Sequence, residues 1–246
     1  MSFMKIKVIN PNTTASMTEK IGIAACRVAS PGTEIIACNP TTGPVSIEGH
    51  YDEALSVVGI LEEIRKGETE GVDGYVIACF GDPGLLAARE LAKGPVLGIA
   101  EAAMHAATFV ATGFSIVTTL SRTQIIAQHL VERYGMTHSC RKIRAVNLPV
   151  LSLEADSFAK TMILKECQIA LKEDGCGAIA LGCGGMADLA TEISSQLGIP
   201  VIDGVSVAVK FVEMLVSLGL TTSKVGDLAY PIAKPYMGML SAFAPQ

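Results

Sequence analysis

Short apolar runs alternate along the chain with longer stretches in which apolar residues recur at helical spacing. The runs are bounded by glycine, proline or small polar residues and contain β-branched residues, as is typical of strands buried on both faces. In the first half the predicted strands are residues 4–9, 34–38, 75–80 and 95–99, and the predicted helices cover about 14–29, 51–67 and 85–93. This alternation predicts a mainly parallel sheet.

The second half shows the same alternation, and a polar loop in the first half stands out against it. The second set of predicted strands is 114–120, 142–150, 177–183 and 200–204, with helices over about 101–111, 122–134, 157–173, 186–198 and 205–218. Residues 39–49 (NPTTGPVSIEG) are polar, contain proline and glycine, and are long enough for a functional role.

The two halves also repeat each other in detail. GYVIACFGDPGLLAARELAKGPVLGIAE and GAIALGCGGMADLATEISSQLGIPVIDG share the order strand, Cys, Gly, helix, Pro-Val, strand. Pro95 follows Cys79 by 16 residues, and Pro200 follows Cys183 by 17. We therefore predict an α/β fold of two similar lobes with mainly parallel sheets, related by pseudo-twofold symmetry. The first lobe is expected to contain residues 1–98 and about 207–246, and the second residues 99–206.

The repeat also predicts where a ligand binds. Ligands of open α/β sheets bind beyond the carboxyl ends of the strands. In both KVINPNT and SIVTTLS, small polar residues follow a strand near the start of a half. Two facing lobes would therefore bring Asn10, Thr118, Thr119, Cys79 and Cys183 around one cleft.

Composition and charge narrow the class of protein. Half of the residues are hydrophobic and 17% are charged, which favours a compact globular chain. The net charge of −5 comes without a basic stripe, so a small molecule is expected as partner, and neither nucleic acid nor a membrane. The N-terminal MSFMKIKVIN lacks the long apolar run of a signal peptide, and no apolar stretch reaches the roughly 20 residues of a spanning helix. A cytoplasmic location is expected.

The cysteines and histidines offer no framework of disulfides or metal ligands. Seven cysteines are an odd number, and no Cys-x-x-Cys pair occurs. No lysine motif for pyridoxal phosphate and no metal-ligand spacing is visible, so neither metal nor cofactor is expected. Ordinary structural roles are expected for Cys26, Cys38, Cys140, Cys167, Cys176, His50, His105, His129 and His138.

Two thiols on opposite sides of a cleft suit a racemase. Racemisation beside a carbonyl removes a proton from one face of a carbon and returns one to the other face. Cys79 and Cys183 each follow a strand and precede a predicted helix, whose N-terminus favours a thiolate. The glycines beside them would let backbone N–H groups approach an enolate.

Other interpretations of the same residues remain open at this point. A cysteine in an apolar run is usually a packing residue, and Asn10, Thr118 and Thr119 could serve as helix caps. Residues 182–187 (GCGGMA) match the G-x-G-x-x-A pattern of a dinucleotide site, with Asp203 lying 21 residues after the first glycine. The second position of that pattern is the repeated cysteine, which favours the thiol interpretation.

With the motifs KVINPNT, IACFGDPGLLAARE and LGCGGMA, the chain resembles the aspartate/glutamate/hydantoin racemase superfamily over nearly its whole length. The resemblance implies two α/β lobes, an active site between them, and a homo-oligomer. It also implies that Cys79 and Cys183 each act as the base for one enantiomer.

The residues around the thiols favour one branch of that superfamily. Glutamate and aspartate racemases typically have Cys-Asn-Thr and Cys-Thr-His, whereas this chain has CFGDP at 79–83 and CGGM at 183–186. It is similar to the hydantoin and allantoin racemases, whose neutral cyclic ureides need amides and hydroxyls rather than a basic clamp. Allantoin is favoured because Gly81 stands where hydantoin racemases favour aspartate, which leaves room for a ureido group.

We therefore predict a cofactor-independent two-base racemase that interconverts (R)- and (S)-allantoin, a reaction of purine degradation, with residues 43–47 closing over the substrate. The alternatives are a racemase of 5-substituted hydantoins, a relative of maleate isomerase or a decarboxylase that uses the same thiols, and a ureide- or nucleotide-binding protein without catalysis. The predicted substrate-binding residues are Asn10, Pro44, Ile47, Phe80, Gly81, Thr118, Thr119, Gly184 and Gly185.

Overall fold

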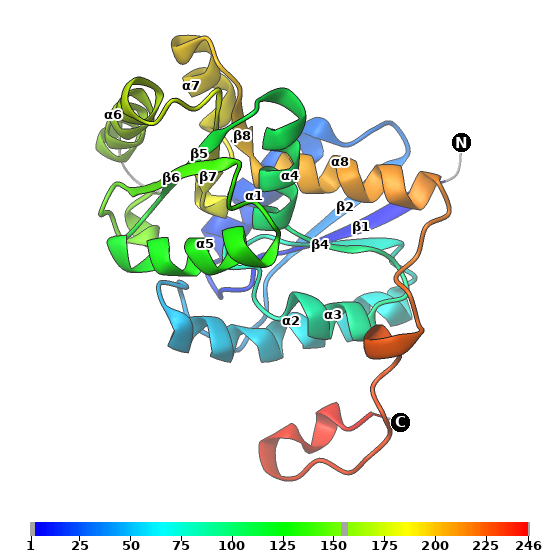
Figure 1. Cartoon of the computed structure of the whole chain (residues 1–246). Coiled ribbons are helices and arrows are strands. Elements are labelled where there is room, and N and C mark those ends of the chain that lie inside the picture. Colours follow the sequence, from blue (N-terminus) through cyan, green and yellow to red (C-terminus); the bar gives the residue numbers. More distant parts are fainter. Residues whose placement is uncertain (1–2, 154–156, 246) are drawn as a thin grey trace.

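The computed structural model describes residues 3–153 and 157–245 and contains two four-stranded parallel sheets (Figure 1). The first sheet has the order β2-β1-β3-β4 and the second the order β6-β5-β7-β8. Their strands are β1 (Met4–Ile9), β2 (Thr33–Cys38), β3 (Gly74–Ile77), β4 (Val96–Gly98), β5 (Phe114–Thr118), β6 (Cys140–Ala145), β7 (Ala178–Gly182) and β8 (Val201–Asp203). The predicted α/β fold of two lobes with parallel sheets is confirmed.

Helices connect the strands and cover the sheets, as parallel sheets require. The α-helices are α1 (Ala15–Val28), α2 (His50–Glu70), α3 (Leu85–Leu91), α4 (Ile99–Val110), α5 (Ser121–Arg133), α6 (Ser157–Glu173), α7 (Ala190–Leu197) and α8 (Gly204–Ser217). Short 3-10 helices span Val150–Leu153, Gly184–Met186, Gly226–Leu228 and Gly238–Phe243. No helix in the described ranges is both long and apolar enough to cross a membrane.

The register of the sheets defines which residues are equivalent in the two lobes. Ile77 of β3 pairs with Gly98 and Leu181 of β7 pairs with Asp203, in both cases directly before the next helix, so Ile77 and Leu181 are equivalent. Their partners on the other side are Ile9 of β1 and Val117 of β5. Counting one residue onward makes Asn10 equivalent to Thr118, and counting two onward from β3 and β7 makes the two cysteines equivalent. The repeat in the sequence is therefore a repeat in space.

Two helices join the lobes by crossing between them. α4 follows the first sheet but packs on β7 and β8, whereas α8 follows the second sheet and packs on β3 and β4. The start of α8 lies so close to α4 that a Cβ on Gly204 would come within 2.3 Å of the Ile99 carbonyl oxygen. This packing supports our proposed assignment of residues from about 207 onward to the first lobe.

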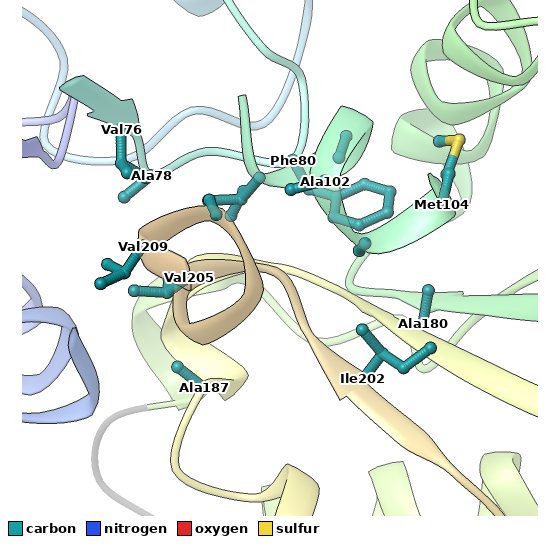
Figure 2. Packing of buried hydrophobic residues seen from close by; sticks show 14 of the residues in the cluster. Val76, Ala78, Phe80, Ala102, Met104, Ala180, Ala187, Ile202, Val205 and Val209 are labelled. Atoms are coloured by element: carbon teal, nitrogen blue, oxygen red, sulfur yellow. The ribbon is translucent and has the colours of Figure 1, made fainter. Parts of the chain in front are cut away.

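Apolar side chains of α8 complete the core beneath the end of β3. Figure 2 shows Val205 and Val209 facing Val76 and Ala78, and all four are buried. Ala78 immediately precedes Cys79, so the end of β3 packs against a close-packed apolar layer.

Several boundaries differ from those that the sequence predicted: the strand expected over 142–150 is β6 and ends at Ala145, and two further differences lie near the cysteines. β3 ends at Ile77 instead of residue 80, whereas α3 begins at Leu85 as predicted, after Gly84 in the left-handed region with φ 65°. After Cys183, the helix predicted over 186–198 begins later: a 3-10 helix spans Gly184–Met186, and α7 begins at Ala190. The apolar pattern continued through both turns, which hid the ends of the regular elements.

Candidate active site

Both cysteines line one cavity between the ends of the two sheets, as the repeat predicted. The cavity and its opening to solvent together contain about 600 Å³ of empty space, of which about 50 Å³ can hold the centre of a water-sized sphere. Each lobe contributes to its wall, and both thiols are partly exposed there. The lining residues are Asn10, Asn12, Met17, Ile47, Glu53, Ala78, Cys79, Phe80, Gly81, Thr118, Thr119, Thr123, Ile126, Ala127, Val150, Gly182, Cys183 and Gly184.

Each thiol receives the backbone N–H of the residue two positions later. Gly81 donates to the Cys79 sulfur, and Gly185 donates to the Cys183 sulfur. The expected backbone N–H donors are thus present at both thiols, but no long helix begins directly after either cysteine: α3 begins at Leu85, and Cys183 is the N-cap of the short 3-10 helix Gly184–Met186. A pair of single amide donors, one in each lobe, takes the place of the helix N-termini.

The two thiols differ in their electrostatic surroundings. Burial raises the pKa of Cys183 to about 11, while the N–H of Gly185 and the charge of Lys20 act in the opposite direction. Burial raises the pKa of Cys79 further, and the neighbouring Cys183 and Glu53 add to that rise. Cys183 is therefore the more acidic thiol of the pair in the free protein.

A buried carboxylate fixes the turn that carries Cys79. Asp82 lies in the left-handed region with φ 45°, and it accepts hydrogen bonds from the N–H groups of Ala100 and Glu101 at the start of α4. The Tyr134 hydroxyl donates to the same carboxylate at 2.7 Å. Only glycine fits at position 98, because a Cβ there would lie 2.1 Å from the Asp82 carboxyl carbon. The turn after Cys79 is thus locked onto the first turn of α4.

The equivalent helix in the second lobe is capped differently, which excludes the dinucleotide interpretation. Asp203 occupies the position equivalent to Gly98 and accepts the N–H groups of Val205 and Ser206. Its carboxylate is therefore engaged as the N-cap of α8. Gly184 also faces protein instead of a phosphate, since a Cβ there would lie 2.6 Å from the Ala78 carbonyl oxygen.

The amide of Asn10 organises the turn after β1. Its Nδ2 donates to the Asn12 side chain at 2.9 Å and to the Thr18 hydroxyl at 3.0 Å. Asn12 Oδ1 accepts the first of these bonds and also the N–H of Thr14, while Asn12 Nδ2 donates to the Met17 thioether at 3.2 Å. Because a thioether is a weak acceptor, Asn12 is the better placed of the two to donate to a ligand.

The two threonines have different roles. The Thr118 hydroxyl donates to the Gly182 carbonyl and shares a second hydrogen bond with Thr123, so it is engaged within the second sheet. Thr119 also lines the cavity, and no residue within 3–153 or 157–245 hydrogen-bonds to its hydroxyl. Thr119 is therefore available to a ligand, whereas Thr118 supports the strand end.

Three other predicted binding residues lie in different settings. Ile47 lines the cavity, and Pro44 does not: its carbonyl accepts both the N–H and the hydroxyl of Thr13, which anchors the loop. The ring of Phe80 belongs to the apolar core beside Ala102, so this residue helps to shape the cavity from behind (Figure 2). Phe80 thus both packs in the core and lines the cavity.

Glu53 is a cavity residue that sequence reasoning missed. It lies on α2, in a segment whose pattern predicts only an ordinary amphipathic helix. Its Oε1 would lie 3.1 Å from a Cβ on Gly81, and its Oε2 lies 3.5 Å from His50 Nδ1. Burial raises the pKa of this carboxyl, partly offset by His50. No motif in the sequence signals its position.

Contacts between the lobes close the cavity on one side. The Glu48 carboxylate accepts the N–H of Val150 at 2.7 Å, joining the loop before α2 to the second lobe. The ring of His50 stacks on that of His129 with centroids 6.1 Å apart. Ile47, the last residue of the predicted loop 43–47, therefore lines the cavity, and the residues that follow it are joined to the second lobe.

Known proteins resemble the chain throughout its length. The model of the Asp/Glu/Hydantoin racemase family matches residues 6–212. A hydantoin racemase of Rhizobium meliloti is 52% identical over 96% of this chain and 98% of its own. The structure of an allantoin racemase from Klebsiella pneumoniae has a TM-score of 0.97 and 61% identity, covering 99% of this chain and all of that one. The allantoin racemase from Pseudomonas fluorescens has a TM-score of 0.92 and 39% identity, covering 96% of this chain and all of that one.

Proposed function

The chain belongs to the Asp/Glu/hydantoin racemase family, and on this premise we propose that it interconverts (R)- and (S)-allantoin with Cys79 and Cys183 as acid and base. Its relatives make it an isomerase of the racemase type. The observation that carries the proposal is the placement of two register-equivalent thiols on one cavity, each bonded by the same backbone donor.

The reaction needs two proton transfers on opposite faces of C5 of the hydantoin ring. The thiolate on one side takes the C5 proton, and the electron pair of the C–H bond passes into the adjacent carbonyl as an enolate. The thiol on the other side then gives its proton to C5, which restores the carbonyl and leaves the opposite enantiomer. The two sulfurs exchange protonation states in each turnover, so the reverse reaction starts from the other thiolate.

Donors in the cavity wall support the enolate and the ring. Asn12 Nδ2 has a weak acceptor as its present partner, and the hydroxyl of Thr119 points to the same cavity. Neutral donors of this kind suit the carbonyl groups of an uncharged ring. The absence of lysine and arginine among the described lining residues also favours a neutral substrate over an amino acid carboxylate.

Racemisation of other 5-substituted hydantoins is the second candidate, favoured by the hydantoin racemase of Rhizobium meliloti at 52% identity. The allantoin racemase from Klebsiella pneumoniae at 61% identity, together with Gly81, supports allantoin as the main substrate. Comparing loss of optical rotation with allantoin and with 5-benzylhydantoin separates the two. Preference for the benzyl compound would reverse our choice.

The mechanism is tested by serine substitution at each cysteine in deuterated water. Cys79→Ser and Cys183→Ser should each reduce racemisation by about 10²-fold or more, because either transfer then lacks its partner. Each variant should still exchange C5–H for deuterium in the one enantiomer that faces the remaining thiol, and the two variants should differ in which enantiomer that is.

The exposed Cys26 provides the control, since Cys26→Ser should racemise as the wild type does. Full racemisation by either active-site variant would refute the two-base mechanism. Absence of C5 exchange in the wild type would instead favour a decarboxylase-like or isomerase-like reaction of the thiols, and ligand binding without any turnover would favour a binding protein.

A further inference from the structure

Glu53 is a charged group in a cavity that is otherwise neutral. Glu53 is the one residue with a charged side chain among the lining residues that the structure describes. It comes from α2 of the first lobe, and the carboxylate breaks the pseudo-twofold symmetry that the cysteines obey. The proposed proton transfers at C5 do not involve Glu53, so another role must account for its position in the cavity.

The carboxylate has one engaged oxygen and one oxygen turned toward the turn of Cys79. Oε2 faces His50 Nδ1 at 3.5 Å, on the outer side of α2 where the imidazole is largely exposed. Oε1 lies against Gly81, at 3.1 Å from the position of a missing Cβ. No donor in residues 3–153 or 157–245 hydrogen-bonds to Oε1. A strong acceptor is therefore presented to the cavity beside Cys79.

The surroundings of this oxygen are apolar. The side chain of Ile126 lies 3.7 Å from the missing Cβ of Gly81, and Ile47 and Ala127 line the same cavity. An apolar group placed here would remove water from the carboxylate without replacing its hydrogen bonds, which is costly. A group with N–H donors would satisfy Oε1.

We propose that Glu53 is a specificity-determining residue that accepts a hydrogen bond from the ureido group at C5, and so selects ureido-substituted over alkyl- or aryl-substituted hydantoins. This inference rests on the proposed function and names the part of the substrate that the acidic residue recognises. Gly81 belongs to the same device, because any side chain there would occupy the space next to Oε1. The burial that raises the pKa of Glu53 also makes an unpaired carboxylate at this place unfavourable.

The test compares two substrates of similar size in three proteins. Wild type, Glu53→Gln and Glu53→Leu are assayed for racemisation of allantoin and of 5-isobutylhydantoin. Glu53→Leu should lower kcat/KM for allantoin by about tenfold or more, chiefly through KM, and should leave or raise kcat/KM for the isobutyl compound. Glu53→Gln keeps a carbonyl acceptor and should lie between. Glu19→Leu, an exposed glutamate on α1, is the matched control.

Two kinetic outcomes overturn the proposal. One is an equal loss on both substrates in Glu53→Leu, as a structural role or contact with the ring N–H would give, and the other is no loss on allantoin. Calorimetric binding of allantoin to the Cys79→Ser, Cys183→Ser double variant, with and without Glu53→Leu, separates this inference from the proposed function. Weaker binding with Glu53→Leu supports the role of Glu53 even if the wild type racemises neither compound, whereas unchanged binding overturns it.

Discussion

Glu213 ties α8 to the first lobe, and its replacement by glutamine should destabilise the fold in a pH-dependent way. The buried carboxylate accepts hydrogen bonds from the N–H of Ser30 at 2.7 Å and from the hydroxyl of Thr33 at 2.7 Å. It also accepts bonds from the Ser30 hydroxyl and from Lys210 Nζ. Burial by itself would raise the pKa of Glu213, but these donors hold it at about 2.

The size of the effect follows from that pKa. A fall from the ordinary value of 4.5 to about 2 corresponds to about 3 kcal/mol of folding free energy. Because the folded pKa is depressed, this contribution is complete above pH 4.5 and is lost as the pH falls toward 2. Glu213→Gln should therefore lower the free energy of unfolding by about 3 kcal/mol at pH 7 and by progressively less below pH 4.5.

Urea unfolding followed by circular dichroism at pH 7, 4 and 3 measures this difference. Glu34→Gln, at an exposed position of β2, is the control and should change stability by less than about 0.5 kcal/mol. A loss below about 1 kcal/mol at pH 7, or a loss that stays constant down to pH 3, would refute the reasoning.

Three further predictions concern the cavity and its support. Gly98→Asp should lower the melting temperature, because the new side chain clashes with Asp82. Adding Asp82→Gly should recover most of the loss, because the aspartate introduced at position 98 can then cap α4 as Asp203 caps α8. A double variant no more stable than the single one would contradict this. Iodoacetamide should alkylate Cys183 before Cys79, since the pKa of Cys183 is raised only to about 11 and the pKa of Cys79 lies higher. The alkylation rate should rise about tenfold per pH unit between pH 7 and 10. Peptide mass spectrometry determines the order, and earlier labelling of Cys79 would contradict the prediction. Asn12→Asp keeps the acceptor oxygen of the turn but removes the Nδ2 donor. The KM for allantoin should therefore rise about tenfold in steady-state assays. An unchanged KM would count against a contact between Asn12 and the substrate.

The sequence alone was sufficient to predict the two lobes and the facing cysteines. Apolar strand patterns and the repeated Cys-Gly turn depend on local residue order, which is visible without coordinates. The register of β3 and β7 then confirms that Cys79 and Cys183 occupy equivalent positions. Thr119 and Ile47 were also placed correctly at the cavity.

The parts that could not be predicted depend on contacts between distant segments. Glu53 reaches the cavity only because α2 packs beside the turn at Gly81, and nothing near it in the sequence marks this. Asp82 caps a helix that begins 17 residues later, so it looks like an ordinary loop residue. The helix over 186–198 was predicted to begin earlier than α7 does, at Ala190, because apolar periodicity continues where regular α-helical hydrogen bonding does not.

The exchange of α4 and α8 between the lobes has a consequence for the order of folding. During synthesis, every strand of the first sheet leaves the ribosome long before Gly204–Ser217, the helix that covers β3 and β4. The contact between Ser30 and Glu213 spans 183 residues, so the apolar face beside Cys79 stays uncovered until the chain is almost complete. Such late closure slows folding and leaves an aggregation-prone surface on the nascent chain. The active site therefore forms among the last parts of the molecule, when α8 docks.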